Sequence, residues 1–175
     1  MKFILVFIIA TLFVGCSQIN FNERYNGRSW EKVILAPSAG DYSSVLSEAL
    51  EHNLATSNTI EVITPVMLPF LLAEHNLVDI YQQNHTKAVF ELAKRVNAQG
   101  VILSTAEGIE PTRRELQASV QLSAQLIDVE SKAIVMSSKI ADSSIFSNVR
   151  DLIAFNATKL ISDLDEAFIK LNAIQ

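Results

Sequence analysis

A strict alternation of apolar and polar residues between Leu116 and Leu126 constrains the fold of this chain more than any other feature. Every second residue there is Leu, Ala or Val, and the residues between them are Gln or Ser. Because side chains in a strand point alternately to opposite faces, this pattern predicts one strand with a buried face and a polar outer face. The predicted outer face presents Gln117, Ser119, Gln121 and Ser123.

The alternation changes phase after Leu126, where Ile127 and Val129 become the apolar positions. A slip of one residue turns the following side chains to the other face, so we expect a β-bulge between Leu126 and Ile127. A tight turn at 130–131 then leads into a partner strand over 133–141.

Helical and strand-like patterns alternate through the rest of the chain. Their order, β-α-β-α-α-β-β-β-α, predicts an α/β fold with a single mixed sheet, helices packed on that sheet and a long C-terminal helix. In chain order we expect a strand at 32–36, a helix ending near 54, a strand at 59–63, a helix within 66–76, an amphipathic helix over 88–96, a strand at 101–103, the hairpin over 116–141 and a helix over 147–171.

Two residues set the limits of the middle helices. Pro69 does not suit a helix interior, so the helix in the apolar window 66–72 begins at Pro69 or is kinked there. Gly100 follows the amphipathic helix and is expected to end it in a left-handed conformation. The apolar window either packs in the core or forms an exposed patch for a partner. Its candidate partner-binding side chains are Val66, Met67 and Phe70.

The chain begins with a pattern typical of a bacterial lipoprotein. Lys2 precedes an apolar run too short to span a bilayer, and the small residue Gly15 stands directly before Cys16, the only cysteine. The sequence therefore predicts a signal peptide over 1–15 and lipidation at Cys16; the alternative is an ordinary signal peptide with a chance cysteine. Ser17 after the cysteine favours the outer membrane, with the body on its periplasmic face and held by the lipid anchor.

The mature chain is expected to consist of two parts. Residues 16–30 show no period and are predicted to be the lipidated cysteine and a flexible tether. Residues 31–175 form one α/β domain of ordinary size. Three aromatic residues in the predicted tether either dock on the domain or contact a partner: Phe21, Tyr25 and Trp30.

Composition excludes several classes of function. The chain has 14 Lys and Arg against 19 Asp and Glu, and no basic cluster, so nucleic acid is not an expected partner. With Cys16 lipidated, no internal disulfide can form. The three histidines fall on separate elements, and no hydrolase, dinucleotide or phosphate-loop motif occurs. We therefore expect no metal, no cofactor, no catalytic residue and no enzymatic activity.

The order of elements and several short runs resemble a family of periplasmic lipoprotein domains. The family comprises the curli secretion subunit CsgG, the penicillin-binding-protein activator LpoB and the amino-terminal domain of TolB. The resemblance covers about residues 31–170 and implies the same α/β domain. It is carried by Ile60-Glu61-Val62-Ile63, Leu68, Leu71 to Leu77, the helix to Gln99-Gly100, Val101-Ile102-Leu103 and Asp128-Val129.

These observations favour a non-enzymatic accessory or scaffold protein that binds another envelope protein. A regulator of a peptidoglycan synthase and a component of a secretion or flagellar assembly are the expected kinds of role, and a homo-oligomer is possible. The alternative is a small-molecule or glycan-binding module, which requires a pocket near Pro37–Asp41 or the loop 108–114. An enzyme, the third class, requires a cleft with perturbed titratable groups.

Overall fold

The computed structural model describes residues 16–56, 59–112 and 116–173. The predicted signal peptide, residues 1–15, lies outside the described residues and stays a prediction.

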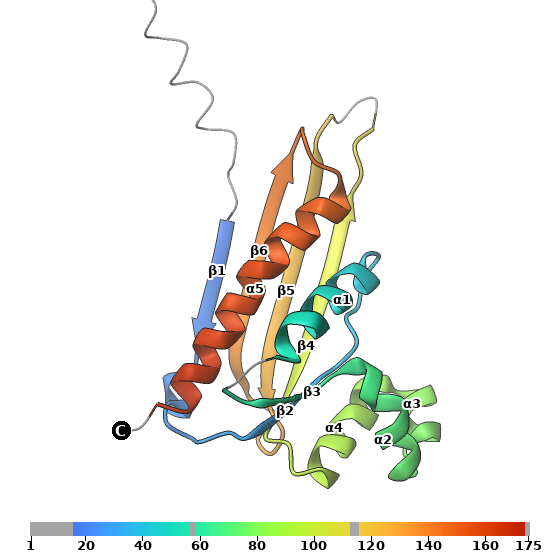
Figure 1. Cartoon of the computed structure of the whole chain (residues 1–175), viewed down its shortest axis with the longest axis vertical. Helices are drawn as coiled ribbons and strands as arrows, with labels where there is room; N and C mark the ends of the chain where they lie inside the picture. Colours follow the sequence, from blue (N-terminus) through green and yellow to red (C-terminus); the bar gives the residue numbers. More distant parts are fainter. Residues whose placement is uncertain (1–15, 57–58, 113–115, 174–175) are drawn as a thin grey trace, which may run out of the picture.

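A six-stranded mixed sheet forms the centre of the described chain (Figure 1). Its spatial order is β1-β6-β5-β4-β2-β3. β2 is parallel to β3 and β4, whereas β1–β6, β6–β5 and β5–β4 are antiparallel pairs. The strands are β1 (Cys16–Phe21), β2 (Lys32–Leu35), β3 (Glu61–Ile63), β4 (Gly100–Ile109), β5 (Ala118–Asp128) and β6 (Ile134–Ser144).

Helices pack against both faces of the sheet and bury two hydrophobic clusters. Val33 and Leu35 of β2 belong to the cluster that includes α1 and α5, whereas Ile34 and Ala36 belong to the cluster of α2, α3 and α4. Because neighbouring strand residues point to opposite faces, the two clusters lie on opposite sides of β2. The helices are α1 (Ser43–Leu54), α2 (Leu68–Glu74), α3 (Val78–Gln83), α4 (His85–Arg95) and α5 (Val149–Leu171), with short 3-10 turns η2 (Glu23–Tyr25) and η3 (Pro65–Met67).

The long helix α5 runs along one face of the antiparallel strands, with α1 beside it (Figure 1). Its stripe of apolar residues, from Val149 to Leu171, is buried, as helical spacing predicts. The Asn148 side chain caps its N-terminus by accepting a hydrogen bond from the Asp151 amide at 2.9 Å. The structure thus confirms the predicted fold class: one mixed sheet, helices packed on it and a long C-terminal helix.

The predicted β-bulge is also present. The pairing between β5 and β6 shifts register between Leu126 and Ile127, where the apolar phase of the sequence changes. Residues 129–131 form the turn that joins the two strands. The Asp128 carboxylate stabilises this turn by accepting hydrogen bonds from the Ser131 amide and hydroxyl.

The segment predicted as a flexible tether contains regular structure instead. Cys16–Phe21 forms β1, which pairs along β6 at one edge of the sheet. Trp30 is buried in the first cluster, and the Tyr25 ring meets it edge-on at a centroid distance of 6.1 Å. The aromatic residues of this segment therefore dock on the domain, which is one of the two predicted alternatives.

Three helical details differ in part from expectation. α2 begins at Leu68 with Pro69 in its first turn, so the first alternative for this proline is confirmed to within one residue. α3 lies between the two predicted middle helices, in an interval where no helix was predicted. Gly100 is the first residue of β4, and the left-handed residue after α4 is Asn97, with φ 56°. The expectation for Gly100 was wrong because its role is to make room for Trp30.

Candidate functional site

The outward-facing side chains of β4, β5 and β6 form a polar surface, the open face. Strand register places them in three cross-strand rows, in which opposite residues share a face. All nine side chains are exposed or half-buried. The rows are Ile109–Ser119–Ser143, Glu107–Gln121–Ala141 and Thr105–Ser123–Lys139.

The opposite face of the same strands is part of the core. Val120, Leu122 and Ala124 alternate with the open-face residues of β5 and are buried, with α5 packed against this strand. Small or flexible side chains, most of them polar, occupy the middle of the open face, and the Thr105 and Ser123 hydroxyls hydrogen-bond each other at 2.8 Å. Such an exposed, mostly polar surface is suited to contact with another macromolecule.

Three of the four predicted outer-face residues lie on the open face. Gln121 is exposed, whereas Ser119 and Ser123 are half-buried between neighbouring strands. Gln117 is exposed but precedes β5, so it lies at the end of the strand and not within the rows. The contributions of β4 and β6, such as Glu107 and Lys139, required the register and were not predicted.

A shallow hollow of about 540 Å³ lies at the end of the open face where β4 ends. Its wall includes open-face residues of all three strands together with Asp41 and Asp142. Asp142 is 8% exposed and accepts a hydrogen bond from the buried Asn156 amide at 2.8 Å. This carboxylate therefore already accepts a hydrogen bond from within the fold. The hollow is mainly a depression in the surface.

Cys16 begins β1 and pairs with Ala141, so its backbone extends the row that contains Gln121. The predicted lipidation position thus stands at the sheet edge, next to the open face and with no spacer before the first strand. The modification itself stays a prediction.

The other predicted partner-binding residues form a second exposed surface, the helical patch. Val66 and Phe70 are 63% and 73% exposed, and Met67 is also exposed. Leu68 and Leu72 point the other way and are buried, because positions four apart share a helix face. The helical patch lies with α2–α4 at the end of the molecule opposite the β4–β5 connection (Figure 1).

A separate hollow of about 300 Å³ lies near Pro37–Asp41, where the alternative function requires a pocket. Pro37, Ser38 and Ala39 line it from one side, and His85 and Tyr81 from the other. The Ser38 and Ser104 hydroxyls in its wall hydrogen-bond each other at 2.7 Å. This hollow has the position expected for a small ligand, and the two serine hydroxyls in its wall are already hydrogen-bonded to each other.

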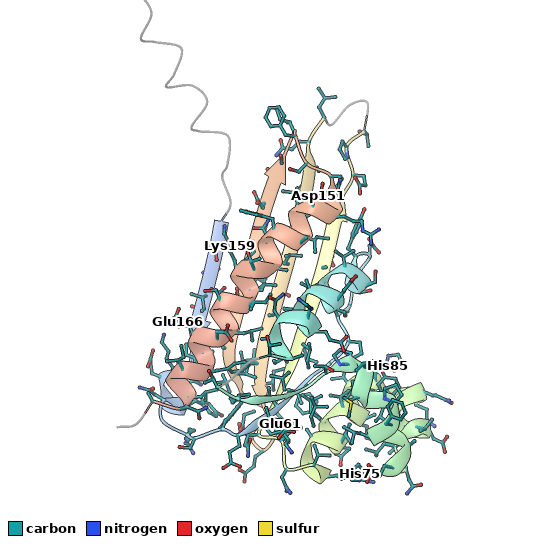
Figure 2. All side chains as sticks on the ribbon, viewed as in Figure 1. Glu61, His75, His85, Asp151, Lys159 and Glu166 are labelled. Atoms are coloured by element: carbon teal, nitrogen blue, oxygen red, sulfur yellow. The ribbon has the colours of Figure 1, made fainter. Side chains whose placement is uncertain are left out.

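Perturbed titratable groups trace to pairwise contacts and local burial. The hydrogen bond from the Tyr42 hydroxyl to Glu110, 2.9 Å long, raises the pKa of Tyr42. An ion pair with Lys94 lowers the pKa of Glu91, and one with Glu166 raises the pKa of Lys170. Burial raises the pKa of Asp165 and lowers that of Lys132. Figure 2 shows labelled charged side chains such as Lys159 and Glu166 distributed along the outside of α5.

No group of three or more His, Cys, Asp or Glu side chains among the described residues is placed to hold a metal ion. Among the helices built from those same residues, none has the length and hydropathy needed to cross a membrane.

This chain is similar to known proteins in its structure and not in its sequence. No protein-family model matches the chain, and no curated protein matches its sequence. The PelC dodecamer from Paraburkholderia phytofirmans aligns with a TM-score of 0.54 at 17% identity, over 92% of this chain and 99% of that chain.

Two further structures align at lower scores. The LpoB C-terminal domain from Escherichia coli has a TM-score of 0.48 at 18% identity, over 65% of this chain and 83% of that chain. Lipoprotein GNA1162 from Neisseria meningitidis has a TM-score of 0.45 at 16% identity, over 78% of this chain and 99% of that chain. LpoB is one of the proteins that the sequence resembles, whereas these matches do not support the CsgG and TolB part of that prediction. The fold of this chain is thus similar to that of PelC over nearly its whole length.

Proposed function

We propose that this chain is an outer-membrane lipoprotein of the periplasmic face that acts without catalysis, by binding another envelope protein. The observation that carries the proposal is the open face: three mostly polar rows across β4, β5 and β6 that no described helix covers, on the back of a well-packed core. Exposed, mostly polar rows with only a shallow hollow suit a protein partner better than a small ligand.

The proposal extends to self-association. PelC, which shares the fold, is a dodecamer in its crystal structure, and we propose that copies of this chain also contact one another. The proposed partner is a peptidoglycan synthase, which the chain would regulate, or a secretion or flagellar structure, which it would support. The helical patch is the second proposed contact surface, because Phe70 and Val66 are mostly exposed apolar side chains.

Site-specific photo-crosslinking in cells tests this proposal. A benzoylphenylalanine at Gln121 on the open face, or at Phe70 in the helical patch, should capture protein, since both side chains are exposed and tolerate replacement. Lys159, exposed on the outside of α5, is the matched control position. Mass spectrometry of the products separates a second copy of this chain from a different envelope protein.

We expect capture at position 121 or 70 to exceed that at 159 several-fold. Equal yields at all three positions, or no product at 121 and 70, would contradict the proposal.

A small-molecule or glycan-binding function is the second candidate, and the hollow near Pro37–Asp41 favours it. The Ser38 and Ser104 hydroxyls in its wall already hydrogen-bond each other. We therefore prefer protein binding, for which the open face offers nine exposed or half-buried side chains on three neighbouring strands.

A further inference from the structure

Exposed apolar side chains gather at one end of the sheet, where β4 ends, β5 begins and β6 ends. The pairs Ile109–Ser119 and Ala118–Ser144 bring these strand ends together, at the top of the molecule in Figure 1. The exposed fractions are large for such residues. We define the apolar tip as Ile109, Leu116, Ile145 and Phe146, which are 57%, 74%, 54% and 79% exposed.

A turn stabilised by side-chain hydrogen bonds holds Ile145 and Phe146 outward. The Ser144 side chain is buried, and its hydroxyl accepts a hydrogen bond from the Phe146 amide at 3.0 Å and contacts the Ser147 hydroxyl at 3.4 Å. Val149, the first residue of α5, is fully buried. The two apolar side chains therefore project from a short segment fixed at both ends, so their exposure is a property of the fold.

The apolar tip lies near the point where the chain enters the described structure. Cys16 pairs with Ala141, three residues before Ser144 at the end of β6. At about 3.3 Å per strand residue, the end of β6 is about 10 Å beyond Cys16 along the sheet. The helical patch, in contrast, lies at the other end of the molecule (Figure 1).

We infer that the apolar tip inserts into the lipid leaflet that holds the lipidated Cys16. This inference rests on the lipid anchor of the proposed function. A lipid on Cys16 holds that residue at the leaflet surface, and apolar groups about 10 Å beyond it reach the boundary between headgroups and acyl chains, where interfacial side chains insert by about 5–10 Å. The position of Cys16 places lipid next to the apolar tip. The helical patch lies at the end away from the leaflet, where it can contact a protein.

A fluorescent probe of membrane depth tests the inference. Phe146→Cys in the full chain is labelled with a nitrobenzoxadiazole thiol reagent, after purification from membranes and reconstitution in phosphatidylethanolamine–phosphatidylglycerol vesicles. The vesicles carry lipids with a nitroxide quencher in the acyl chain. Phe70→Cys is the matched control, since Phe70 is equally exposed but belongs to the helical patch. Leu116→Cys is a second probe of the apolar tip, and unfolding curves verify that each variant is folded.

We expect the nitroxide lipids to reduce emission at positions 146 and 116 about twofold and to leave position 70 unchanged, because only the apolar tip reaches the acyl boundary. The unsubstituted chain, labelled in parallel, reports on the anchor: a lipidated Cys16 has no thiol to label. A blocked Cys16 with no quenching at 146 and 116 would overturn the inference and leave the proposed function intact. A labelled Cys16 would overturn the anchor, and the inference with it.

Discussion

Gly100 illustrates how single positions determine the packing of this fold. A Cβ at this position would meet the Trp30 ring at 2.4 Å and Leu126 Cδ1 at 3.1 Å. The ring of Trp30 therefore occupies the space that any other residue at 100 would need, and it joins the segment before β2 to the sheet. The sequence offered a glycine after a helix, for which a cap is the ordinary explanation; the contact with a residue seventy positions earlier has no local signal.

We predict that Gly100→Ala lowers the free energy of unfolding by about 1–3 kcal/mol, because the aromatic ring must shift within a packed core. Urea unfolding of the single variants and of Gly100→Ala with Trp30→Leu completes a double-mutant cycle. The double variant should be more stable than the sum of the two losses predicts, by about 0.5–3 kcal/mol, since the clash is absent. Additive losses would show that the ring does not create the constraint at position 100.

The polar residues of the open face were predictable one strand at a time. The alternation in 116–126 identified Ser119, Gln121 and Ser123 as one face of a strand. It did not identify Glu107 or Lys139 as their neighbours, because register between strands depends on turns and bulges that are not read from one strand alone. The bulge itself was predictable, since the phase change at Leu126 leaves a trace in the sequence.

At the scale of elements, β1 and α3 were missed for related physical reasons. Ser17 to Asn20 are all exposed and only Phe21 packs against the core, so β1 has no apolar alternation to reveal it. α3 spans six residues, none of which is fully buried, so it has no buried apolar stripe. Elements that contribute few core residues carry little hydrophobic pattern, whereas α5, with a buried stripe along its whole length, was predicted to within two residues.

The pairing of β1 with β6 leads to a prediction about backbone hydrogen bonds. The Asn22 amide donates to the Val135 carbonyl at 2.7 Å, which sets the phase of the antiparallel ladder. By this phase the Gln18 amide faces β6 and the Ser17 amide faces solvent. Gln18→Pro should therefore destabilise the protein by about 1–3 kcal/mol, through a lost ladder bond and an unpaired carbonyl.

Ser17→Pro is the matched control, because proline is tolerated on the solvent side of an edge strand; its loss should be below about 0.5 kcal/mol. Chemical denaturation measures both variants, and hydrogen exchange of the β6 amides follows the edge directly. A Ser17→Pro variant as unstable as Gln18→Pro would mean that the ladder has the opposite phase.

At the scale of the whole molecule, β2 connects the two hydrophobic clusters. Its alternate side chains enter the cluster of α1 and α5 and the cluster of α2–α4. Neither cluster can lose its packing without disturbing this strand. The described chain should therefore unfold as one cooperative unit, as expected for a domain of this size.

We predict that Leu92→Ala, in the cluster of α2–α4, and Leu122→Ala, in the other cluster, each cost about 2–5 kcal/mol in a single transition. Trp30, the only tryptophan, reports on the cluster of α1 and α5, and far-ultraviolet circular dichroism reports on all helices. The two signals should give the same midpoint for both variants. If Leu92→Ala separated an early loss of helix from a later change in Trp30 fluorescence, the two clusters would be independent.

The position of Cys16 as the first residue of β1 also has a mechanical consequence. Six residue pairs join β1 to β6 in antiparallel register, and β1 runs away from Cys16 toward the far end of the sheet. A lipid-anchored Cys16 under tension would therefore load these pairs in shear, along the strand axis. Shear must rupture several hydrogen bonds together, whereas peeling breaks them one after another. An envelope protein tethered in this way would transmit force from the leaflet directly into its central sheet.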